Sequence, residues 1–435
     1  MVSNALAASL GRRNVHYGWV VVASTFLTML VTAAAMGAPG VLIVPLEKEF
    51  GWTTSEISAA LALRILLYGL LGPFAAAFMN RFGVRRVILT ALALICVGFL
   101  ASLNMTGLWQ LMLLWGVVVG LGTGLTAMVL AATVATRWFN KRRGLVVGLL
   151  AASSATGQLV FLPVIAALTT DYGWRTALAF MCAMLAATAL VTLALMRDRP
   201  ADLALPIYGE TQVTPAPAQG EGLWSLMMSP LLVLKDAART GTFWILFATF
   251  FVCGCSTNGL VQTHFVTFCS DYGLAAVTAA SVLAMMGVFD FFGTIGSGWL
   301  SDRFDSRYLL AWYYGLRGLS LLFLPFTDFT FYGLSLFAVF YGLDWIATVP
   351  PTVKLTADRF GREKAGLVFG WVFAGHQIGA AFAAYGAGLT RTEFGTYVPA
   401  FFAAGALCLI AAVLVLFISR GLRLSSGPAT AAAGG

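Results

Sequence analysis

Asn80-Arg81-Phe82-Gly83-Val84-Arg85-Arg86 is a short basic loop between two long apolar stretches of the chain. A second loop of the same kind follows 222 residues later (303 − 81), as Asp302-Arg303-Phe304-Asp305-Ser306-Arg307. The same offset places Gly144-Leu145-Val146 on Gly366-Leu367-Val368. A constant offset between distant positions indicates two copies of one structural plan. Two halves of like topology are a recurrent design of membrane transporters.

The composition predicts an integral membrane protein. Hydrophobic residues make up 60% of the chain and charged residues 10%, whereas a soluble protein of this size carries roughly 25% charged residues. Twelve apolar runs are long enough to cross a bilayer as helices. Because lipid cannot satisfy backbone polar groups, and the alternating pattern of a β-barrel is absent, the spans must be helical. We therefore expect an all-α integral membrane protein with twelve transmembrane helices in two six-helix pseudo-repeats.

The repeat and the composition also predict the domain boundaries. Residues 1–196 form the N-terminal six-helix half, and residues 241–424 form the C-terminal half. Between them, residues 197–240 are richer in proline, glycine and charge, which is typical of a linker. We expect part of this linker, around Leu223 to Val233, to be amphipathic and the rest to be flexible. Residues 425–435 are small and polar, and we expect a disordered tail.

The net charge of +8 reflects membrane topology rather than a nucleic-acid partner. Three basic residues (Lys48, Arg175 and Arg391) fall in loops on one side, and two (Arg64 and Arg317) fall within spans. The other 21 of the 26 Lys and Arg residues (26 − 5) share the opposite side. Positive residues concentrate on the cytoplasmic side of membrane proteins. This pattern predicts a multi-pass protein of the cell inner (plasma) membrane with both termini in the cytoplasm.

No metal site or cofactor site is expected. Of the six cysteines, Cys253 and Cys255 lie closest together, and their spacing of two points them to different faces of a helix. This geometry is poor for a metal or a disulfide, so the cysteines are interpreted as packing residues. No loop for binding ATP and no nucleophile–base pair is present. We therefore expect a protein that is not an enzyme.

Glycine and proline mark two of the spans. Gly116, Gly120, Gly122 and Gly124 lie in the fourth span, where small residues let helices approach closely. We interpret them as packing residues rather than as a phosphate-binding loop. Pro350-Pro351 is placed within the tenth span. Proline kinks a helix, and the sequence leaves open whether this is a fixed bend or a flexing point for gating.

The second loop resembles a motif of the major facilitator superfamily. Gly298-Trp299-Leu300-Ser301-Asp302-Arg303, followed by Arg307, is similar to the G-x-L-x-D-R-x-x-x-R loop of that superfamily. The first loop is a weaker match, with Asn80 where Asp is usual. The resemblance implies that these loops brace a gate on the cytoplasmic side. The implied gating residues are Arg81, Arg85, Asp302, Arg303 and Arg307.

A narrower resemblance is to the monocarboxylate transporter branch, including bacterial oxalate/formate-like members. Trp138-Phe139-Asn140-Lys141-Arg142-Arg143-Gly144-Leu145-Val146-Val147-Gly148 is similar to the signature that enters helix 5 in that branch. Well-known members also carry a Lys after a Pro in helix 1, but here Gly40 follows the proline. They carry an Asp in helix 8 and an Arg four residues later. Asp290 matches the Asp, whereas Thr294 replaces the Arg. These departures argue against simple lactate or pyruvate as the substrate.

Four ionisable residues within the spans are candidates for function: Arg64, Asp290, Arg317 and Asp344. Asp290 lies 12 residues before Asp302 (302 − 290), and Arg64 lies 16 residues before Asn80 (80 − 64). At the rise of a helix these distances are roughly 18 Å and 24 Å, in a hydrocarbon core of about 30 Å. An unpaired charge at this depth costs about 3 kcal/mol or more. Each of the four should therefore pair or face a wet cavity.

Pairing separates the two arginines. Arg317 is expected to form a structural ion pair, with Asp290 and Asp344 as the rival partners. Arg64 has no acid within the spans of the first half. Because an intramembrane charge is a functional-site hypothesis by default, Arg64 is predicted to bind the anionic group of a substrate. Tyr68 lies one turn away from Arg64 and is a further substrate-binding candidate, as are Asn258, Gln262 and His376. For His376 a packing role is an equal alternative.

A mechanism follows as a hypothesis. A guanidinium binds a carboxylate with two hydrogen bonds and keeps its charge at any working pH. A carboxylate removed from water exchanges its proton nearer physiological pH. Arg64 would then hold the substrate while Asp290 or Asp344 takes up the coupled proton.

The expected function is secondary active transport of a small organic acid of the monocarboxylate type, with an acid derived from an aromatic compound as one candidate. Uptake would be coupled to protons and would proceed by alternating access. The alternative is efflux of metabolites or drugs by proton antiport, although the fifth span (Ser153 to Gln158) lacks the G-P-x-x-G pattern of drug antiporters. The expected partners are a small organic anion, protons and the lipid bilayer, and a monomer is expected.

Overall fold

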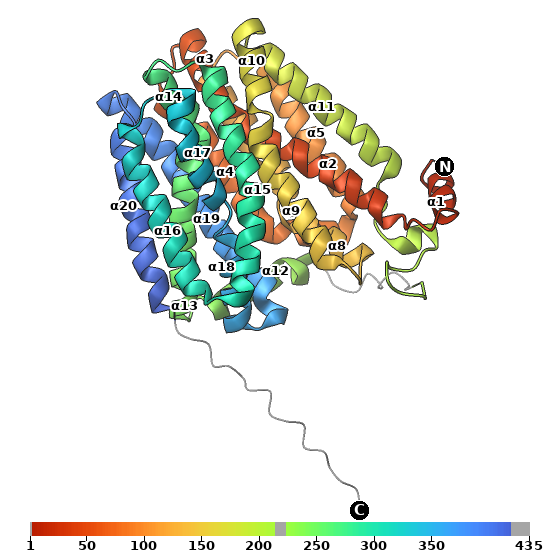
Figure 1. The fold of residues 1–435 in the computed structure, drawn as a ribbon. Helices are drawn as coiled ribbons and strands as arrows, with labels where there is room; N and C mark the ends of the chain where they lie inside the picture. Colours follow the sequence, from red (N-terminus) through yellow and green to blue (C-terminus); the bar gives the residue numbers. More distant parts are fainter. Residues whose placement is uncertain (1, 214–222, 419–435) are drawn as a thin grey trace, which may run out of the picture.

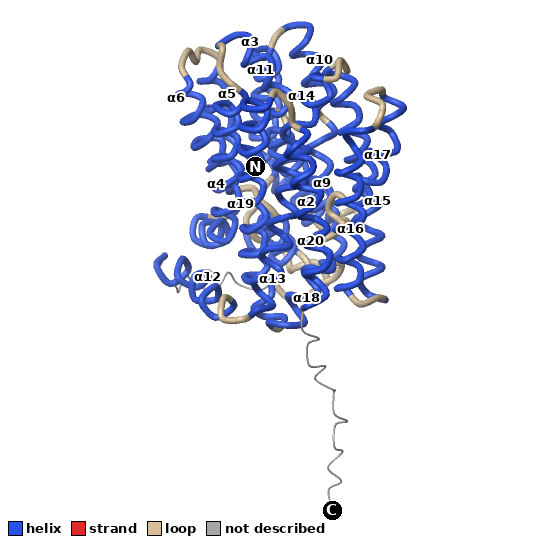
Figure 2. The backbone as a smooth tube through the Cα atoms, turned by 90° about the vertical axis from the view of Figure 1, so that its left-hand side faces the viewer, coloured by secondary structure: helices blue, strands red, loops and turns tan. Residues whose placement is uncertain are grey.

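The computed structural model describes residues 2–213 and 223–418 of the chain. The described residues fold into helices joined by short loops, as Figure 2 shows, with one isolated backbone bridge between Phe139 and Tyr208. The all-α prediction is confirmed for this part of the chain. The predicted tail at residues 425–435 lies outside the described residues, as do residues 419–424 at the end of the C-terminal half.

The first half of the bundle and its flanking helices run from the N-terminus to the linker (Figure 1). Their bounds are α1 (Val2–Gly11), α2 (Gly18–Gly37), α3 (Pro39–Phe50), α4 (Thr54–Phe82), α5 (Val84–Ser102), α6 (Leu108–Leu111), η1 (Met112–Val119), α7 (Gly120–Leu125), α8 (Val129–Trp138), α9 (Arg143–Val160), α10 (Leu162–Tyr172), α11 (Trp174–Leu195) and η2 (Pro200–Leu203).

The linker and the second half follow the same plan. Their bounds are α12 (Leu223–Ala237), α13 (Gly241–Gly254), η3 (Cys255–Gln262), α14 (Thr263–Asp271), α15 (Ala276–Arg303), α16 (Ser306–Phe323), η4 (Leu324–Phe326), α17 (Phe331–Asp344), α18 (Val349–Phe360), α19 (Arg362–Phe394), α20 (Val398–Leu414) and η5 (Val415–Phe417).

Eleven helices among the described residues are long and apolar enough to cross a membrane. The remaining predicted span, the fifth, consists of α9 and α10, which are interrupted at Phe161 just before Pro163. Proline lacks the N–H that a continuous helix requires. The fifth span is therefore present as two shorter helices rather than as one long helix.

Proline also sets the position of two other helix breaks. The first span divides at Ala38, immediately before Pro39. The tenth span divides between Asp344 and Val349, and Pro350 and Pro351 occupy the first turn of α18. The tenth span is therefore interrupted at the predicted prolines, with the break directly before them, and a role of this break as a flexing point for gating stays a prediction. Proline is tolerated in the first turn because the N–H it lacks has no helical partner there.

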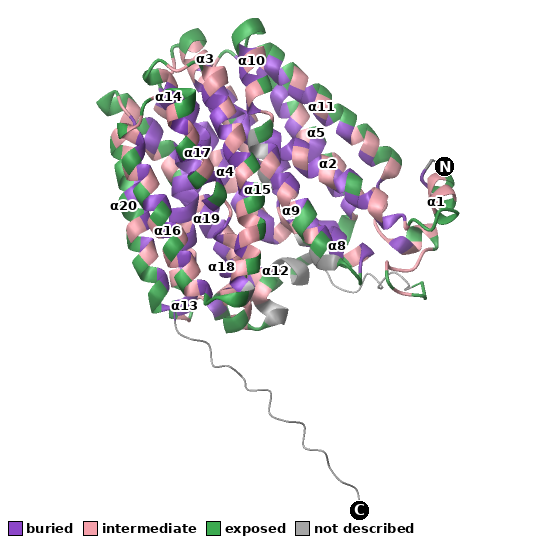
Figure 3. Ribbon diagram, viewed as in Figure 1, coloured by how far each residue is buried: buried purple, intermediate pink, exposed green. Residues whose placement is uncertain are grey.

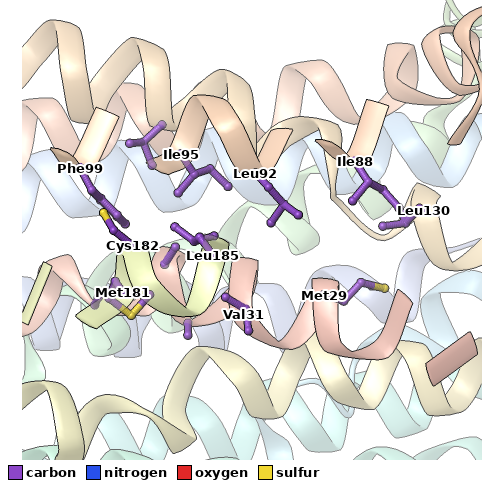
Figure 4. Packing of buried hydrophobic residues seen from close by; sticks show 14 of the residues in the cluster. Met29, Val31, Ile88, Leu92, Ile95, Phe99, Leu130, Met181, Cys182 and Leu185 are labelled. Carbon is purple, nitrogen blue, oxygen red and sulfur yellow. The ribbon is translucent and has the colours of Figure 1, made fainter. Parts of the chain in front are cut away.

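Two large hydrophobic cores lie in the two halves of the bundle. The first is built from residues between Tyr17 and Met196, and Figure 4 shows part of it, where Phe99 of α5 lies beside Cys182 of α11 and Ile88 of α5 lies beside Leu130 of α8. The second is built mainly from residues between Ala237 and Ile418. A smaller cluster joins them and includes Met36, Tyr68 and Ala384, from α2, α4 and α19. We call it the midline cluster because both halves contribute to it.

The outer faces of the helices are apolar. Large hydrophobic side chains such as Trp312, Leu336 and Phe382 are more than half exposed. Figure 3 shows exposed residues along the outside of the bundle and buried residues along its interior. Exposed apolar surface of this extent marks an interaction with a partner or a membrane, and here lipid is the matching environment.

The two ends of the bundle differ in charge. We call the end that carries loops 80–86, 138–143 and 303–307 the basic end, and the opposite end, with the turns at Gly51, Gly173 and Gly273, the far end. In Figure 1 the far end, with α3, α10 and α14, is at the top.

The described parts of the linker, on either side of residues 214–222, contact the bundle. Helix α12 covers the predicted amphipathic segment, and it packs on α4 and α19. Trp371 of α19 donates a hydrogen bond to the carbonyl of Pro230 in α12 (2.8 Å). The segment before residue 214 is also anchored, because the Tyr208 N–H binds the Trp138 carbonyl (2.9 Å).

Glycine permits the close helix contacts, as expected for the fourth span. A Cβ atom on Gly120 would lie 3.2 Å from the Arg64 Cα, and one on Gly116 would lie 2.9 Å from Leu63. Similar approaches occur in the second half, where a Cβ on Gly379 would lie 2.0 Å from the Phe251 carbonyl oxygen. A side chain at Gly379 therefore has no room, and one at Gly116 or Gly120 would force neighbouring atoms to shift.

A pair of glycines on α19 tests this packing. Gly379→Ala should destabilise the protein by about 1–3 kcal/mol, because the added methyl group forces α19 away from α13. Gly386→Ala is the matched control, since a Cβ at Gly386 meets nothing within 4 Å. Thermal unfolding of the purified proteins in detergent, followed by tryptophan fluorescence, measures both. Equal midpoints for the two variants would show that the α13–α19 contact is not tight.

Candidate functional site

Arg64 is buried in the first half, and its guanidinium binds a break in a neighbouring helix. Its side chain is 3% exposed. Nη1 donates to the carbonyl of Ala35 (3.2 Å) and Nη2 donates to the carbonyl of Met36 (2.9 Å). The carbonyl of Ala35 lacks its usual helical donor because the residue four positions later is Pro39. Arg64 therefore replaces the hydrogen bond that the proline removes.

Arg64 keeps a positive charge without an acidic partner. In the described part of the chain it forms no salt bridge, and its Nε–H has no hydrogen-bond partner. The carboxyl end of α2 carries partial negative charge from the helix dipole, which offsets part of the cost of burying the arginine. Because a buried polar group without a partner is rare, the spare donor and the spare charge mark Arg64 as a candidate anion-binding group.

Tyr68 lies beside Arg64 in the midline cluster. Its hydroxyl shares a hydrogen bond with Ser154 of α9. Its ring lies 6.1 Å from the ring of Phe373 on α19, which in turn stacks on His376 at 5.8 Å. This row of rings links the predicted substrate residues of the first half to those of the second.

The candidates from the second half have unpaired polar atoms near the same region. His376 Nε2 lies 3.4 Å from the hydroxyl of Thr257, and its Nδ1 has no partner among the described residues. Gln262 is 5% exposed, and its Oε1 is also unpaired in the described part of the chain. A Cβ on Gly40, one turn beyond Met36, would lie 2.7 Å from the Gln262 carbonyl, so this residue packs against the first span. Asn258 lies in η3 between Thr257 and Gln262, and it makes an interaction of its own.

Gln377 was missed by the sequence prediction as a site residue. It is 1% exposed, its Oε1 has no described partner, and a Cβ on Gly69 would lie 2.3 Å from its own Cβ. It therefore lies at the contact between α4 and α19. Its position beside His376 in the sequence was the available signal.

His264, by contrast, is held on both ring nitrogens. Nδ1 lies 3.0 Å from the hydroxyl of Tyr397, and Nε2 lies 2.7 Å from the carbonyl of Ala384. Two fixed partners indicate a packing role for this histidine.

Arg317 pairs with Asp344, which decides between the two partners that the sequence left open. Its Nε donates to Asp344 Oδ2 (2.6 Å) and its Nη2 to the Asp344 carbonyl (2.5 Å). Nη1 contacts the sulfur of Cys253 (2.9 Å). Arg317 thus binds the break in the tenth span, as Arg64 binds the break in the first. The difference is that Arg317 has a carboxylate partner.

Asp290 does not pair with Arg317, so that alternative was wrong. Its Oδ1 accepts hydrogen bonds from the hydroxyl of Thr294 (2.9 Å) and from the N–H of Ile346 (2.9 Å). Ile346 lies within the break of the tenth span. Asp290 therefore binds an N–H group of the break in the tenth span, and Arg317 binds carbonyl groups of the same break.

The far end of the bundle is closed by a network that the sequence prediction missed. Arg391 of α19 pairs with Glu47 of α3 (2.7 Å) and with Asp271 of α14 (2.9 Å), and it donates to the hydroxyl of Thr54 (2.6 Å). Glu47 and Arg391 belong to different halves, so this network ties the halves together. Only three basic residues of the sequence fall in loops at this end, and Arg391 is one of them, which was the signal for a specific role.

Three of the predicted gating arginines, Arg85, Arg303 and Arg307, bind residues of their own half or of the adjoining start of the linker. The Arg85 N–H donates to Asp198 (2.8 Å), and its side chain binds the Leu193 carbonyl. Arg303 lies over the ring of Trp299 at 3.9 Å, and Arg307 pairs with Asp305 (2.6 Å). These contacts do not brace the two halves against each other.

Two other gating predictions are less well described. Arg81 makes an interaction of its own, and the side chain of Asp302 lies outside the described residues. The far-end network contains an ion pair between the two halves, Glu47–Arg391.

The family model described as Major Facilitator Superfamily matches residues 25–384. The chain belongs to the major facilitator superfamily. This confirms the resemblance of the two basic loops, and it means that the chain is a multi-pass membrane transporter rather than an enzyme.

Relatives within this superfamily cover most of the chain. An uncharacterized MFS-type transporter of Bacillus subtilis (strain 168), YcxA, is 24% identical over 379 residues, covering 85% of this chain and 88% of the relative. Monocarboxylate transporter 12-B of Danio rerio is 26% identical, with coverage of 92% and 86%. Monocarboxylate transporter 13 of Rattus norvegicus is 26% identical, with coverage of 90% and 87%.

A solved structure shows the same fold. The crystal structure of a D-xylose–proton symporter superposes with a TM-score of 0.70 at 15% identity, covering 94% of this chain and 99% of that chain. The superfamily fold has twelve helices in two halves, which agrees with the twelve predicted spans. The boundaries at residues 196 and 240 stay predictions, although α11 ends at Leu195 and α13 begins at Gly241.

The Arg317–Asp344 pair should behave as a coupled unit in this superfamily member. Arg317→Met should destabilise the protein by about 3–5 kcal/mol, because it leaves a buried carboxylate unpaired. The double variant Arg317→Met/Asp344→Asn should be less destabilised than the sum of the two single variants. Thermal midpoints of the four proteins in detergent give the coupling. Additive effects would mean that the two groups do not depend on each other.

Proposed function

We propose that the chain is a secondary transporter that takes up a small organic acid together with a proton. The observation that carries the proposal is Arg64, a buried guanidinium with a spare donor and no described acid. A carboxylate in the bilayer needs a charge partner, and an arginine provides one that also donates two parallel hydrogen bonds. The monocarboxylate transporters among the relatives support this substrate class.

The remaining contacts of the substrate come from both halves in this proposal. Tyr68 contributes a hydroxyl from α4, whereas His376 contributes from α19 and Asn258 and Gln262 contribute from η3. Gln377 joins them because its amide oxygen is unpaired among the described residues. The aromatic rings of Tyr68 and Phe373 favour an acid with an apolar body. Alternating access then rocks the two halves around this site.

Proton coupling is proposed for Asp290 or Asp344, which both contact the break in the tenth span. Protonation of Asp344 would remove the charge that pairs with Arg317. Protonation of Asp290 would weaken the hydrogen bond that it accepts from the Ile346 N–H. The break between α17 and α18 would then change its geometry. In this way the proton acts on a helix that spans the second half, without needing to touch the substrate.

The orientation is also a proposal. The predicted excess of Lys and Arg at the basic end favours the cytoplasm for that end and for both termini. The membrane would be the cell inner membrane. With the far end closed by the Glu47–Arg391 pair, the described conformation would then be closed toward the outside.

Arg64 variants test the substrate site. Arg64→Gln should raise the KM for uptake about tenfold or more, because a charge-assisted hydrogen bond contributes about 1.5–3 kcal/mol. Arg64→Lys should be intermediate, since it keeps the charge but not the paired donors. The measurement is uptake of a panel of organic acids into proteoliposomes with an imposed pH gradient.

A binding readout separates loss of substrate contact from loss of fold. A substrate that binds the native protein raises the thermal midpoint. Arg64→Gln should unfold as a single transition but lose this shift, whereas Trp312→Phe, at an exposed site on α16, should keep it. Full uptake with unchanged affinity in Arg64→Gln would disprove the assignment of this residue.

Carboxylate variants test the proton step. Neutralising the coupling acid, in Asp290→Asn or Asp344→Asn, should abolish accumulation driven by a pH gradient, because the side chain can no longer carry a proton. Exchange of substrate across the membrane without a gradient should persist. If both variants still accumulate substrate when a pH gradient is imposed, neither acid couples the proton. Accumulation only in vesicles with the opposite gradient would instead support the alternative, efflux by antiport.

A further inference from the structure

A groove runs along the outside of the first half, between α4, α5 and α7. Its volume is about 510 Å³, within the range of sites that enclose a small ligand. Leu71, Phe78 and Phe82 line it from α4, and Arg86, Thr90 and Leu94 line it from α5. Leucines of α7 complete the wall. It is separate from Arg64 and from the midline cluster.

The groove faces away from the second half. Leu71 and Phe78 lie on the face of α4 opposite Gly69 and Pro73, since a helix turns about 100° per residue. Gly69 packs against α19, because a Cβ there would lie 2.3 Å from Gln377, and Pro73 lies beside Gly370. The groove face of α4 is therefore the one turned outward.

The same holds for α5. Arg86, Thr90 and Leu94 are spaced by four residues and share one face. Ile88 and Ile95, on the opposite face, belong to the core of the first half, as Figure 4 shows. Thr90 is exposed. A groove on the outward faces of two membrane helices is open to lipid.

The length of the groove matches one leaflet. Phe82 and Arg86 lie at the basic end, and Leu71 lies eleven residues before Phe82 (82 − 71). Eleven residues of helix rise about 16 Å, and half of a hydrocarbon core is about 15 Å. The apolar wall therefore reaches from the membrane surface to about the middle of the bilayer.

The groove combines an apolar wall with a cation at one end. Arg86 and Thr90 are its polar members. The Arg86 side chain is exposed and makes no described hydrogen bond or ion pair, whereas the side chain of its neighbour Arg85 binds the Leu193 carbonyl. Asp198, the acid that packs on the Gly83 turn, is bound to the Arg85 N–H. A free guanidinium at the surface end of an apolar groove complements a molecule with an anionic head and an apolar tail.

We propose that this groove binds an anionic glycerophospholipid of the leaflet at the basic end. One acyl chain lies along Leu71, Phe78 and Leu94, and the phosphate accepts hydrogen bonds from Arg86. The apolar wall alone does not select this ligand, because every acyl chain is equally apolar. Selection comes from the charge of the head group. One basic residue near the membrane surface raises the affinity for an anionic lipid about fivefold relative to a lipid without net charge.

Native mass spectrometry of the delipidated full chain tests the proposal. The protein is titrated with phosphatidylglycerol and, separately, with phosphatidylcholine of the same acyl chains. Wild type should retain phosphatidylglycerol preferentially, and Arg86→Gln should reduce that preference about fivefold. Arg239→Gln is the matched control, because Arg239 is an exposed arginine that precedes α13 and lies outside the groove. It should retain the wild-type preference.

A second variant tests the groove itself. Thr90→Trp fills the groove from an exposed position and should weaken the tightest binding of both lipids, with an unchanged thermal midpoint in detergent. Three results would overturn the proposal: equal affinity of wild type for the two lipids, equal loss of preference in Arg86→Gln and Arg239→Gln, or undiminished lipid binding in Thr90→Trp.

Discussion

The structure depends on buried arginines that bind the broken ends of membrane helices. A helix interrupted in lipid leaves carbonyl groups without donors, and each such group costs several kcal/mol. Arg64 supplies donors to the end of α2, and Arg317 supplies them to the end of α17. These contacts allow proline to interrupt two spans without leaving the freed carbonyl groups unsatisfied.

The two arginines differ in one respect that bears on transport. Arg317 is neutralised by Asp344 and also contacts Cys253, so its charge is used within the protein. Arg64 binds only carbonyl dipoles among the described residues. The first arrangement is self-sufficient. The second leaves a net positive charge buried in the first half, and the proposed substrate site uses this charge.

The break in the tenth span brings the charged groups of the second half together. Arg317 and Asp290 hold opposite polar groups of the same interruption in the tenth span, and Thr348 of that interruption lies 3.4 Å from the sulfur of Cys253. An ion pair joins the two halves at the far end, while Arg307 at the basic end pairs with Asp305 of its own loop. The ends of the bundle are thus held by contacts of different kinds.

The sequence by itself determined the membrane fold, the repeat and the depth of the charged residues. These follow from the length of apolar runs and from a constant offset, which are properties of the chain read in one dimension. The close contacts of Gly116 and Gly120, and the choice of superfamily, could be predicted for the same reason. The sequence also showed that the carbonyl of Ala35 would lack its helical hydrogen-bond donor, because Pro39 lies four residues later.

Only the tertiary structure decided which charges meet. Asp290 and Asp344 lie at similar depths, so depth alone could not choose the partner of Arg317. The choice depends on how each helix is rotated about its axis and on where the tenth span breaks, and that break falls before Pro350 rather than at it. The Glu47–Arg391 pair joins residues 344 positions apart. Such contacts arise when the two halves pack together, and no local pattern in the chain specifies them.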